Sequence, residues 1–286
     1  MAESFSTPIS RTGALSLYGP PPWHLTGRCL AVWFRVADPG AIRNHVHPLF
    51  KLDENPLIGA RFWDLRHDAG RPDLVCQRGQ LYRMREASIA IPVSFEGVSG
   101  DDTAYMFADE PRYTAYGREV MGWPVIHGEV QFVDTPADPA VDTAPPAQGV
   151  HPDDRVPRPH IGDQISASLH YEGRLTMSMS FTLSGEVDRG VAGGGPQWVT
   201  HRYVPDILGA GRVDQIVLTK PGTASLGPIW AAQASFELTG APGSGLEDLR
   251  PISIEHAELW SDLKLTIADG HILRDLAAAP AVAVAR

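Results

Sequence analysis

The sequence predicts a mostly β fold of the α+β class, with only a few short helices. From Leu175 to Leu183, apolar residues alternate with Thr and Ser, a pattern typical of a half-buried antiparallel strand. Runs rich in β-branched and aromatic residues recur along the chain and end at turn-forming residues. No long segment has the apolar periodicity of an amphipathic helix. These observations together favour an antiparallel sheet.

The first half of the chain is expected to contain strands and two short helical segments. A helix is expected over 39–46, where Pro39 stands near its start. Asp109-Glu110-Pro111 favours a second helical turn, because Pro and acidic residues suit a first turn, and Gly122-Trp123-Pro124 should end it. Turns are expected at Glu96-Gly97 and again over 99–101. The expected strands cover 28–36, 58–65, 88–95, 105–107 and 125–130.

After the Pro-rich segment, the second half is expected to consist of strands, with a flexible loop over 190–195. Glu172-Gly173 predicts a hairpin turn within the segment 165–183. Asp269-Gly270 predicts a turn between two runs of the last segment, 252–276. Further strands are expected over 213–219 and 234–238.

A single domain of 286 residues is the expected organisation, with three peripheral segments. Residues 1–23 have little periodicity and are expected to form an N-terminal arm. Residues 134–163 are rich in Pro, Asp and Ala, which predicts an insertion that is either a flexible loop or a lid over the site. Residues 277–286 form an Ala/Val-rich tail.

Charge and composition exclude several classes of partner. The formal net charge is -10 and the pI is about 5.5, which disfavours nucleic acids and anionic membrane surfaces. No apolar run is long enough to span a membrane and no signal peptide is evident, so a cytoplasmic location is expected. Cys29 and Cys76 are too few for a disulfide framework and have no metal-site spacing.

Three linked motifs then indicate a family. IPVSFEGVSGDD (91–102), DEP (109–111) and GREVMGWP (117–124) occur in an order and spacing that closely resemble the acetoacetate decarboxylase family. The resemblance covers most of the chain apart from the arm, the insertion and the tail. It implies a curved antiparallel sheet that closes into a cone-like β-barrel around a central cavity, and it favours a homo-oligomer.

One departure from the family pattern decides the functional argument. Members that decarboxylate β-keto acids have two lysines directly after the proline of the third motif, and the first forms the Schiff base. This sequence has Val125 and Ile126 at those positions, and neither can attack a carbonyl group. The remaining lysines, Lys51, Lys220 and Lys264, do not match the family position, although a relocated lysine stays an alternative.

Glu86 and Arg28 are the first candidate catalytic residues, because the resemblance places a pocket glutamate and arginine there. If Glu86 faces inward, burial should raise its pKa and make it a general acid or base. The alternative is a surface ion pair of Glu86 with Arg83 or Arg85. Arg28 could hold a substrate carboxylate or enolate through its planar guanidinium group.

Arg118 and Glu119 complete the candidate catalytic set, because they lie at a junction where side chains can point into a cavity. The alternative is an ion pair that only fixes the geometry of the turn. His67-Asp68 does not indicate a metal site, because adjacent strand residues point to opposite faces, and no metal is expected. The expected substrate-binding residues are Phe62, at the place of a second family glutamate, and Tyr116, Trp123, Val125, Ile126 and His127.

The sequence therefore predicts a cofactor-free enzyme that tailors small molecules in secondary metabolism, of the lyase or the isomerase and cyclase type. Its substrate would be an apolar keto compound of polyketide or terpenoid type, larger than acetoacetate. Dehydration, cyclisation, isomerisation and aldol-type steps all fit general acid–base catalysis with oxyanion stabilisation. The alternative is a non-catalytic protein that binds a hydrophobic metabolite.

Overall fold

A computed structural model describes residues 22–67, 82–138, 158–187, 197–205, 211–240 and 243–277. The expected arm up to residue 21, the insertion from 139 to 157, the loop over 190–195 and the tail from 278 lie outside these residues. Within the described residues, twelve strands form one sheet that is antiparallel almost throughout. In chain order the strands are β1 (Trp23–Val36), β2 (Ile58–His67), β3 (Tyr82–Phe95), β4 (Val98–Ala108), β5 (Val125–His127), β6 (Glu129–Thr135), β7 (Gln164–Tyr171), β8 (Arg174–Val187), β9 (Trp198–Pro205), β10 (Gly211–Ser225), β11 (Ile229–Leu238) and β12 (Pro251–Asp275).

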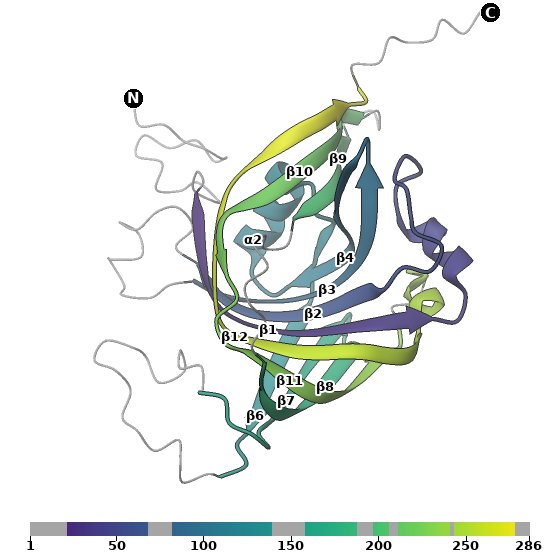
Figure 1. Ribbon diagram of the computed structural model, residues 1–286. Coiled ribbons are helices and arrows are strands. Elements are labelled where there is room, and N and C mark those ends of the chain that lie inside the picture. The colour runs from purple at the N-terminus through teal and green to yellow at the C-terminus, as the bar shows by residue number, and fades with distance from the viewer. Residues whose placement is uncertain are drawn as a thin grey trace, which may run out of the picture.

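The sheet closes into a ring. Its order runs β1-β2-β3-β4-β9-β10-β12, and β12 then pairs with β1. A parallel contact between Asp101 of β4 and Trp198 of β9 joins the two halves of this ring. Figure 1 shows β4, β9 and β10 curling around the short helix α2 (Pro111–Tyr116). The predicted curved sheet around a central space is therefore confirmed.

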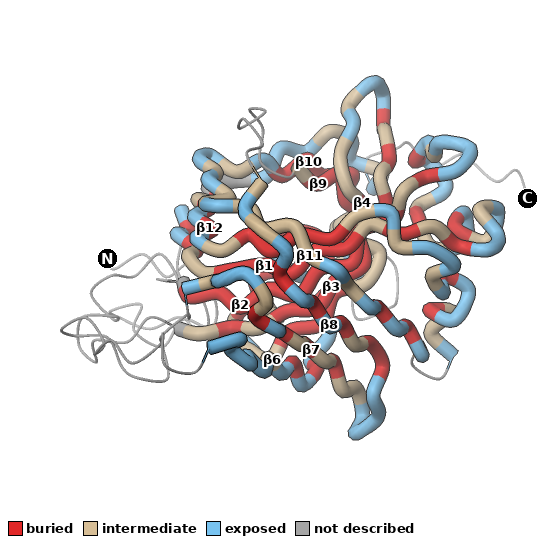
Figure 2. Tube along the Cα trace, turned by 60° about the horizontal axis from the view of Figure 1, so that its bottom comes forward, coloured by how far each residue is buried: buried red, intermediate tan, exposed pale blue. Residues whose placement is uncertain are grey.

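Of the remaining strands, β5 pairs with β4, and the other four form a second layer outside the ring. From β12 the sheet continues through β11, β8, β7 and β6, which lie below β1, β2 and β3 in Figure 1. Because side chains alternate along each strand, β1, β2 and β3 present one face to the ring interior and the other to this layer. Figure 2 shows buried residues concentrated where β1 to β3 meet β8 and β11.

Two apolar cores follow from this arrangement. The outer core lies between β1–β3 and the second layer, and includes Leu30, Phe62, Ala87 and Phe181. The ring core lies inside the ring, and its members include Trp23, Leu25, Cys29, Trp63, Met84, Met106, Tyr113, Tyr116, Trp123, Val125, Trp198 and Leu265. The buried apolar residues of β1 to β3 therefore alternate between the two cores along each strand.

Two predicted hairpin turns are confirmed. Glu96-Gly97 connects β3 to β4, and Glu172-Gly173 connects β7 to β8. Both glutamates have positive φ, 49° at Glu96 and 50° at Glu172, and the following glycines continue the left-handed conformation.

Other expectations on turns and faces are corrected. Asp269-Gly270 forms no turn, because β12 runs on through it with Gly270 opposite Thr219 of β10. The expected break over 99–101 is part of β4. Leu175 is exposed rather than buried, because the β7–β8 register shifts at Leu169 and His170, next to the turn. The alternation is confirmed from Met177 onward.

The helices are short, as predicted. They are η1 (Pro39–His45), α2, the π-helical turn η2 (Gly117–Met121) and η4 (Leu246–Leu249). Gly122 ends η2 with φ of 75°, which confirms the predicted break. A side chain at Gly117 would put its Cβ 2.5 Å from Val125, so the glycine allows α2 and η2 to pack on β5. No helix in the described part of the chain is long and apolar enough to cross a membrane.

Candidate active site

Glu86 lies on β3 with its side chain in the ring core, and only 4% of the residue is exposed. The hydroxyl of Tyr113, on α2, donates a hydrogen bond of 3.1 Å to Oε2 of Glu86. Burial raises the pKa of Glu86 to about 7, although the hydrogen bonds from Tyr113 and Ser88 and the charge of Arg61 oppose the rise. A carboxyl group of this kind exchanges a proton readily near neutral pH. The predicted inward orientation of Glu86 is therefore found, and the surface ion pair is not.

Arg61 supplies a buried positive charge beside this acid. Its Nη2 donates a 2.7 Å hydrogen bond to Oδ2 of Asp101, at the edge of the ring. Burial alone would lower the pKa of Arg61, but the charge of Asp101 and this hydrogen bond raise it, so the guanidinium stays charged. Its Nε is buried and has no hydrogen-bond partner among the described residues. Arg61 therefore holds a donor that a bound molecule can use.

Aromatic side chains from separate elements surround Glu86 and Arg61. Trp63 of β2 donates from Nε1 to Oγ of Ser88 at 3.4 Å. Trp123 follows η2, and its ring centroid lies 6.0 Å from that of Tyr113 and 5.4 Å from that of Trp198 on β9. The Nε1 of Trp123 is buried without a hydrogen-bond partner in the described part of the chain. The site thus has apolar, aromatic walls and a second unused donor.

These residues line one cavity inside the ring. Apolar residues of β1, β4 and β12 complete the wall, among them Leu25, Met106 and Ile267. The volume open to the centre of a water-sized sphere is only about 20 Å³, which is room for about one water molecule. An organic molecule enters only if the walls move. The expected room for a substrate larger than acetoacetate is not present in this conformation.

Strand register explains which residues face Glu86. Glu86 lies opposite Trp63, and the next pair, Ala87 and Phe62, points to the other face of the sheet. Phe62 therefore belongs to the outer core, where its ring packs edge-on against Phe132. The expectation that Phe62 lies beside Glu86 is corrected. Trp63 occupies that place.

Arg28 also lies on the outer face of the sheet. Its Nη1 and Nη2 donate to the two carboxylate oxygens of Asp134 at 2.6 and 2.8 Å. Its Nη2 lies 3.4 Å from Oδ2 of Asp64. The two carboxylate oxygens of Asp64 also accept one hydrogen bond each from Arg83, both of 2.8 Å. Burial would raise the pKa of Asp64, but the hydrogen bond from Arg83 and the charge of Arg28 lower it. Arg28 and Asp64 thus link Asp134 and Arg83 into one network of charges.

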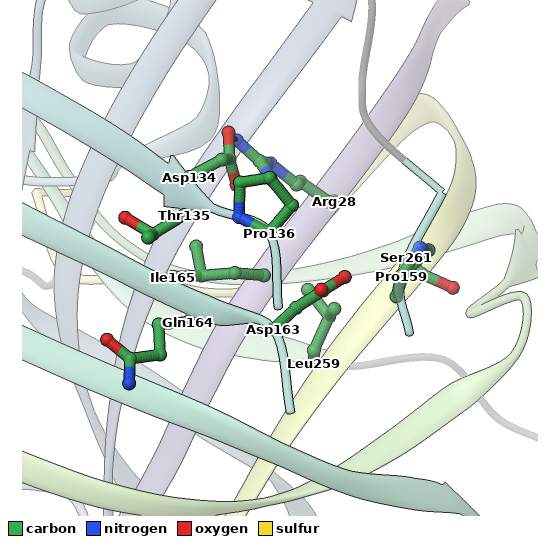
Figure 3. Close-up of a pocket in the computed structure, with 10 residues that line it drawn as sticks. All are labelled: Arg28, Asp134, Thr135, Pro136, Pro159, Asp163, Gln164, Ile165, Leu259 and Ser261. Carbon is green, nitrogen blue, oxygen red and sulfur yellow. Dashed lines mark hydrogen bonds and ion pairs between the residues drawn. The ribbon is translucent and has the colours of Figure 1, made fainter. Parts of the chain in front are cut away.

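A second cavity adjoins this network. Figure 3 shows Asp134 turned toward Arg28, with residues from both ends of the insertion around the cavity. Its volume is about 240 Å³, and Pro136, Pro159 and Asp163 belong to its lining. Because Arg28 and Glu86 face opposite sides of the sheet, the structure does not bring these two predicted catalytic residues into one cavity.

The predicted pair Arg118 and Glu119 lies on η2, and both residues are exposed. Arg118 donates to the carbonyl oxygen of Val125 at 3.3 Å, and the carbonyl oxygen of Glu119 accepts a hydrogen bond from Arg202. The expectation that they point into the cavity is corrected, because the inward face of this short helix carries apolar residues. Ile126 and His127 are exposed as well.

Tyr116 and Val125 are fully buried but do not line the cavity around Glu86. Tyr116 stacks on Trp23, with ring centroids 3.7 Å apart, and so fixes α2 against β1. Val125 lies opposite Met106, which does line the cavity. The position at which the family resemblance expects a reactive lysine is thus next to a residue of the cavity wall, and the side chain there is aliphatic.

Four site residues were not predicted: Arg61, Trp63, Tyr113 and Trp198. Arg61 and Trp63 are two residues apart on β2 and therefore point to the same face of the sheet. Because Trp63 pairs with Glu86, the β2–β3 register would have identified both as site residues. Tyr113 lies between the second and third motifs, close enough to have been considered. Trp198 carries no such signal, because β9 was not predicted.

The described side chains do not point to a metal site. No group of three or more His, Cys, Asp or Glu residues there is arranged to hold a metal ion. Cys29 is free and buried, and burial raises the pKa of its thiol well above the ordinary value. Cys76 and Asp68 lie outside the described residues.

The family model of acetoacetate decarboxylase matches residues 6–276. The chain belongs to the acetoacetate decarboxylase family. Among curated proteins, none matches this sequence significantly.

Solved structures of this family share the fold at low sequence identity. The enduracididine biosynthesis enzyme MppR, complexed with the condensation product of pyruvate and imidazole 4-carboxaldehyde, has a TM-score of 0.77 and 20% identity, covering 96% of this chain and 98% of its own. Acetoacetate decarboxylase from Legionella pneumophila has a TM-score of 0.74 and 18% identity, with coverage of 97% and 96%. An acetoacetate decarboxylase-like enzyme from Sphingomonas wittichii RW1 has a TM-score of 0.77 and 17% identity, with coverage of 96% and 100%. At these identities the likeness establishes the fold.

Proposed function

We propose that this protein is a small-molecule tailoring enzyme that moves a proton on a carbonyl compound, with Glu86 as the general acid and base. The observation that carries the proposal is a carboxyl group with a pKa of about 7, buried in an apolar cavity beside unused hydrogen-bond donors. Isomerisation of an unsaturated ketone and dehydration of a hydroxyketone both need this set of groups.

The first step is removal of a proton from the carbon next to the carbonyl group. The Glu86 carboxylate takes this proton, and the electron pair of the C–H bond moves toward the carbonyl oxygen to give an enolate. Arg61 and Trp123 line the cavity, and their N–H groups would stabilise the negative oxygen. Protonated Glu86 then returns the proton to another carbon in isomerisation, or to a leaving hydroxyl group in dehydration, which releases water.

Schiff-base chemistry has no support among the lysines of this chain. Lys51, Lys220 and Lys264 are all exposed, and none lines the cavity that holds Glu86. Val125 stands where the decarboxylases carry the reactive lysine. We therefore propose acid–base catalysis without a covalent intermediate. The enzymes named above support a catalytic role for the fold, and their own substrates are not transferred to this chain.

Exchange of hydrogen for deuterium at the carbon next to a ketone tests the proposal without knowledge of the natural substrate. Acetone and acetophenone in D2O serve as probes, and NMR measures the loss of the methyl proton signal. The wild type should accelerate exchange, and Glu86→Gln should reduce the acceleration by about 100-fold or more. Asp102→Asn is a matched control, because Asp102 is another buried acid with a raised pKa but does not line the cavity.

The same assay separates an enzyme from a binding protein. A binding protein would bind the ketone, as measured by calorimetric titration, but would not accelerate exchange. Equal exchange by the wild type and Glu86→Gln would contradict the role of Glu86.

A further inference from the structure

The walls of the Glu86 cavity are unusually rich in aromatic rings. Trp63 comes from β2, Tyr113 from α2, Trp123 from the segment after η2 and Trp198 from β9. Three regions that are distant in the sequence, at 63, 113–123 and 198, therefore place four aromatic side chains at one small cavity. Ordinary aliphatic residues would fill this space equally well if the cavity had to be only apolar.

The shape of the free space adds a restriction. With about 20 Å³ open at rest, the cavity accepts a molecule only as its walls separate. The rings of Trp123 and Trp198 meet edge to face at 65°, and that of Tyr113 is tilted by 45° to Trp123. A flat ring needs the smallest separation of such walls and gains stacking and edge contacts with them. A puckered or branched molecule needs more room and makes fewer of these contacts.

The charges in the cavity argue against a cationic guest, the other common ligand of aromatic cages. Arg61 places a permanent positive charge at the wall. Glu86 carries its negative charge only partly near neutral pH, because its pKa is about 7. An anionic guest is disfavoured as well, since Asp101 already balances Arg61. The unused N–H groups of Arg61 and Trp123 suit a neutral acceptor such as a carbonyl oxygen.

We infer that the substrate is a flat, conjugated carbonyl compound without formal charge, whose ring lies among Trp63, Trp123 and Trp198. This inference rests on the proposed function and names its substrate class. Dehydration or isomerisation that extends a conjugated system fits the same walls, because the product becomes flatter than the substrate.

Two methyl ketones test the inference directly. Acetophenone and cyclohexyl methyl ketone have the same carbon skeleton, but only the first has a flat ring. Isothermal titration calorimetry of the wild type should give about tenfold tighter binding of acetophenone. Apolar burial alone would favour the saturated ring or leave the two equal. Equal or tighter binding of cyclohexyl methyl ketone overturns the inference, as does preferential binding of phenyltrimethylammonium, a flat cation.

Two variants locate the effect. Trp198→Leu should abolish the preference for acetophenone, whereas Trp230→Leu should keep it, because Trp230 packs against the outer core. Loss of the preference in both variants, or in neither, contradicts the inference. The two experiments separate failure of this inference from failure of the proposed function. If the protein lacks a preference for flat rings but accelerates exchange through Glu86, the function is supported and the inference is wrong. If it prefers flat rings but does not accelerate exchange, only the inference is supported.

Discussion

The hydroxyl group of Tyr113 lies 3.1 Å from Oε2 of Glu86 and donates a hydrogen bond to it. This contact links the acid on β3 to the helix α2 inside the ring. It favours the carboxylate form and so lowers the pKa of Glu86, while burial raises it more strongly. The helix therefore adjusts the proton affinity of the group that we propose to be the acid and base.

Replacing Tyr113 by Phe tests this adjustment. The variant loses the hydrogen bond that stabilises the carboxylate, so the pKa of Glu86 should rise above about 7. The midpoint of the pH profile of ketone exchange should move to higher pH by about one unit. Tyr116→Phe is the control on the same helix, because Tyr116 stacks on Trp23 and does not line the cavity. An unchanged midpoint in Tyr113→Phe would contradict the claim that this hydrogen bond lowers the pKa of Glu86.

Arg61 should matter through the geometry of its guanidinium group as well as its charge. Lysine keeps the charge but has no planar set of donors that can bind Asp101 and an enolate at once. Arg61→Lys should therefore slow exchange by about tenfold or more, mainly through kcat. Arg83→Lys is a suitable control, since Arg83 binds Asp64 on the opposite face of the sheet. Equal effects of the two substitutions would argue against a direct role of Arg61.

The raised pKa of Asp102 should make the free energy of unfolding depend on pH. Burial raises the pKa of Asp102 to about 8 in the folded protein, from its ordinary value of 3.8. Between these values the folded state holds a proton that the unfolded state has lost, so stability falls as the pH rises through this window. Asp102→Asn has no such proton and should be more stable than the wild type by at least about 1 kcal/mol above pH 8. Urea unfolding at about pH 5 and pH 9 measures the difference, and a gain that does not grow with pH would contradict the assignment.

A Schiff base should not form on this protein. Incubation with acetoacetate and borohydride should leave the mass of the intact chain unchanged, because Lys51, Lys220 and Lys264 are exposed and retain no feature that activates an amine. Reductive methylation of the same lysines with formaldehyde shows that the reagent is active. A stable adduct of acetoacetate would point to a relocated lysine and would contradict acid–base catalysis without a covalent intermediate.

The mostly β class was predictable because alternation and turn residues are local signals, whereas the curvature around a central space came from the family resemblance. Met177 onward in β8 and the turns at Glu96 and Glu172 lie where these signals placed them. The face of the sheet to which each side chain points was harder to predict, because a shift of one residue in strand register reverses it. Phe62 was expected in the cavity, yet its neighbour Trp63 is the residue that faces Glu86.

The site was predictable only in part, for the same physical reasons. Glu86 came from the family resemblance and Trp123 from the third motif, and both line one cavity. Arg28 was expected beside them, but it faces the outer layer and lies within an irregularity of the β1–β12 pairing, between Gly27 and Cys29. Trp198 reaches the cavity through the pairing of β4 with β9, a contact between distant segments that no local pattern reveals.

The most direct test of the central claim is the pH profile of ketone exchange by the wild-type protein. If Glu86 removes the proton, the rate should rise with pH and level off above a midpoint of about 7, because only the carboxylate is active. A midpoint near the ordinary value of a glutamate, or a rate that does not vary with pH between about 5 and about 9, would contradict proton transfer by a buried Glu86.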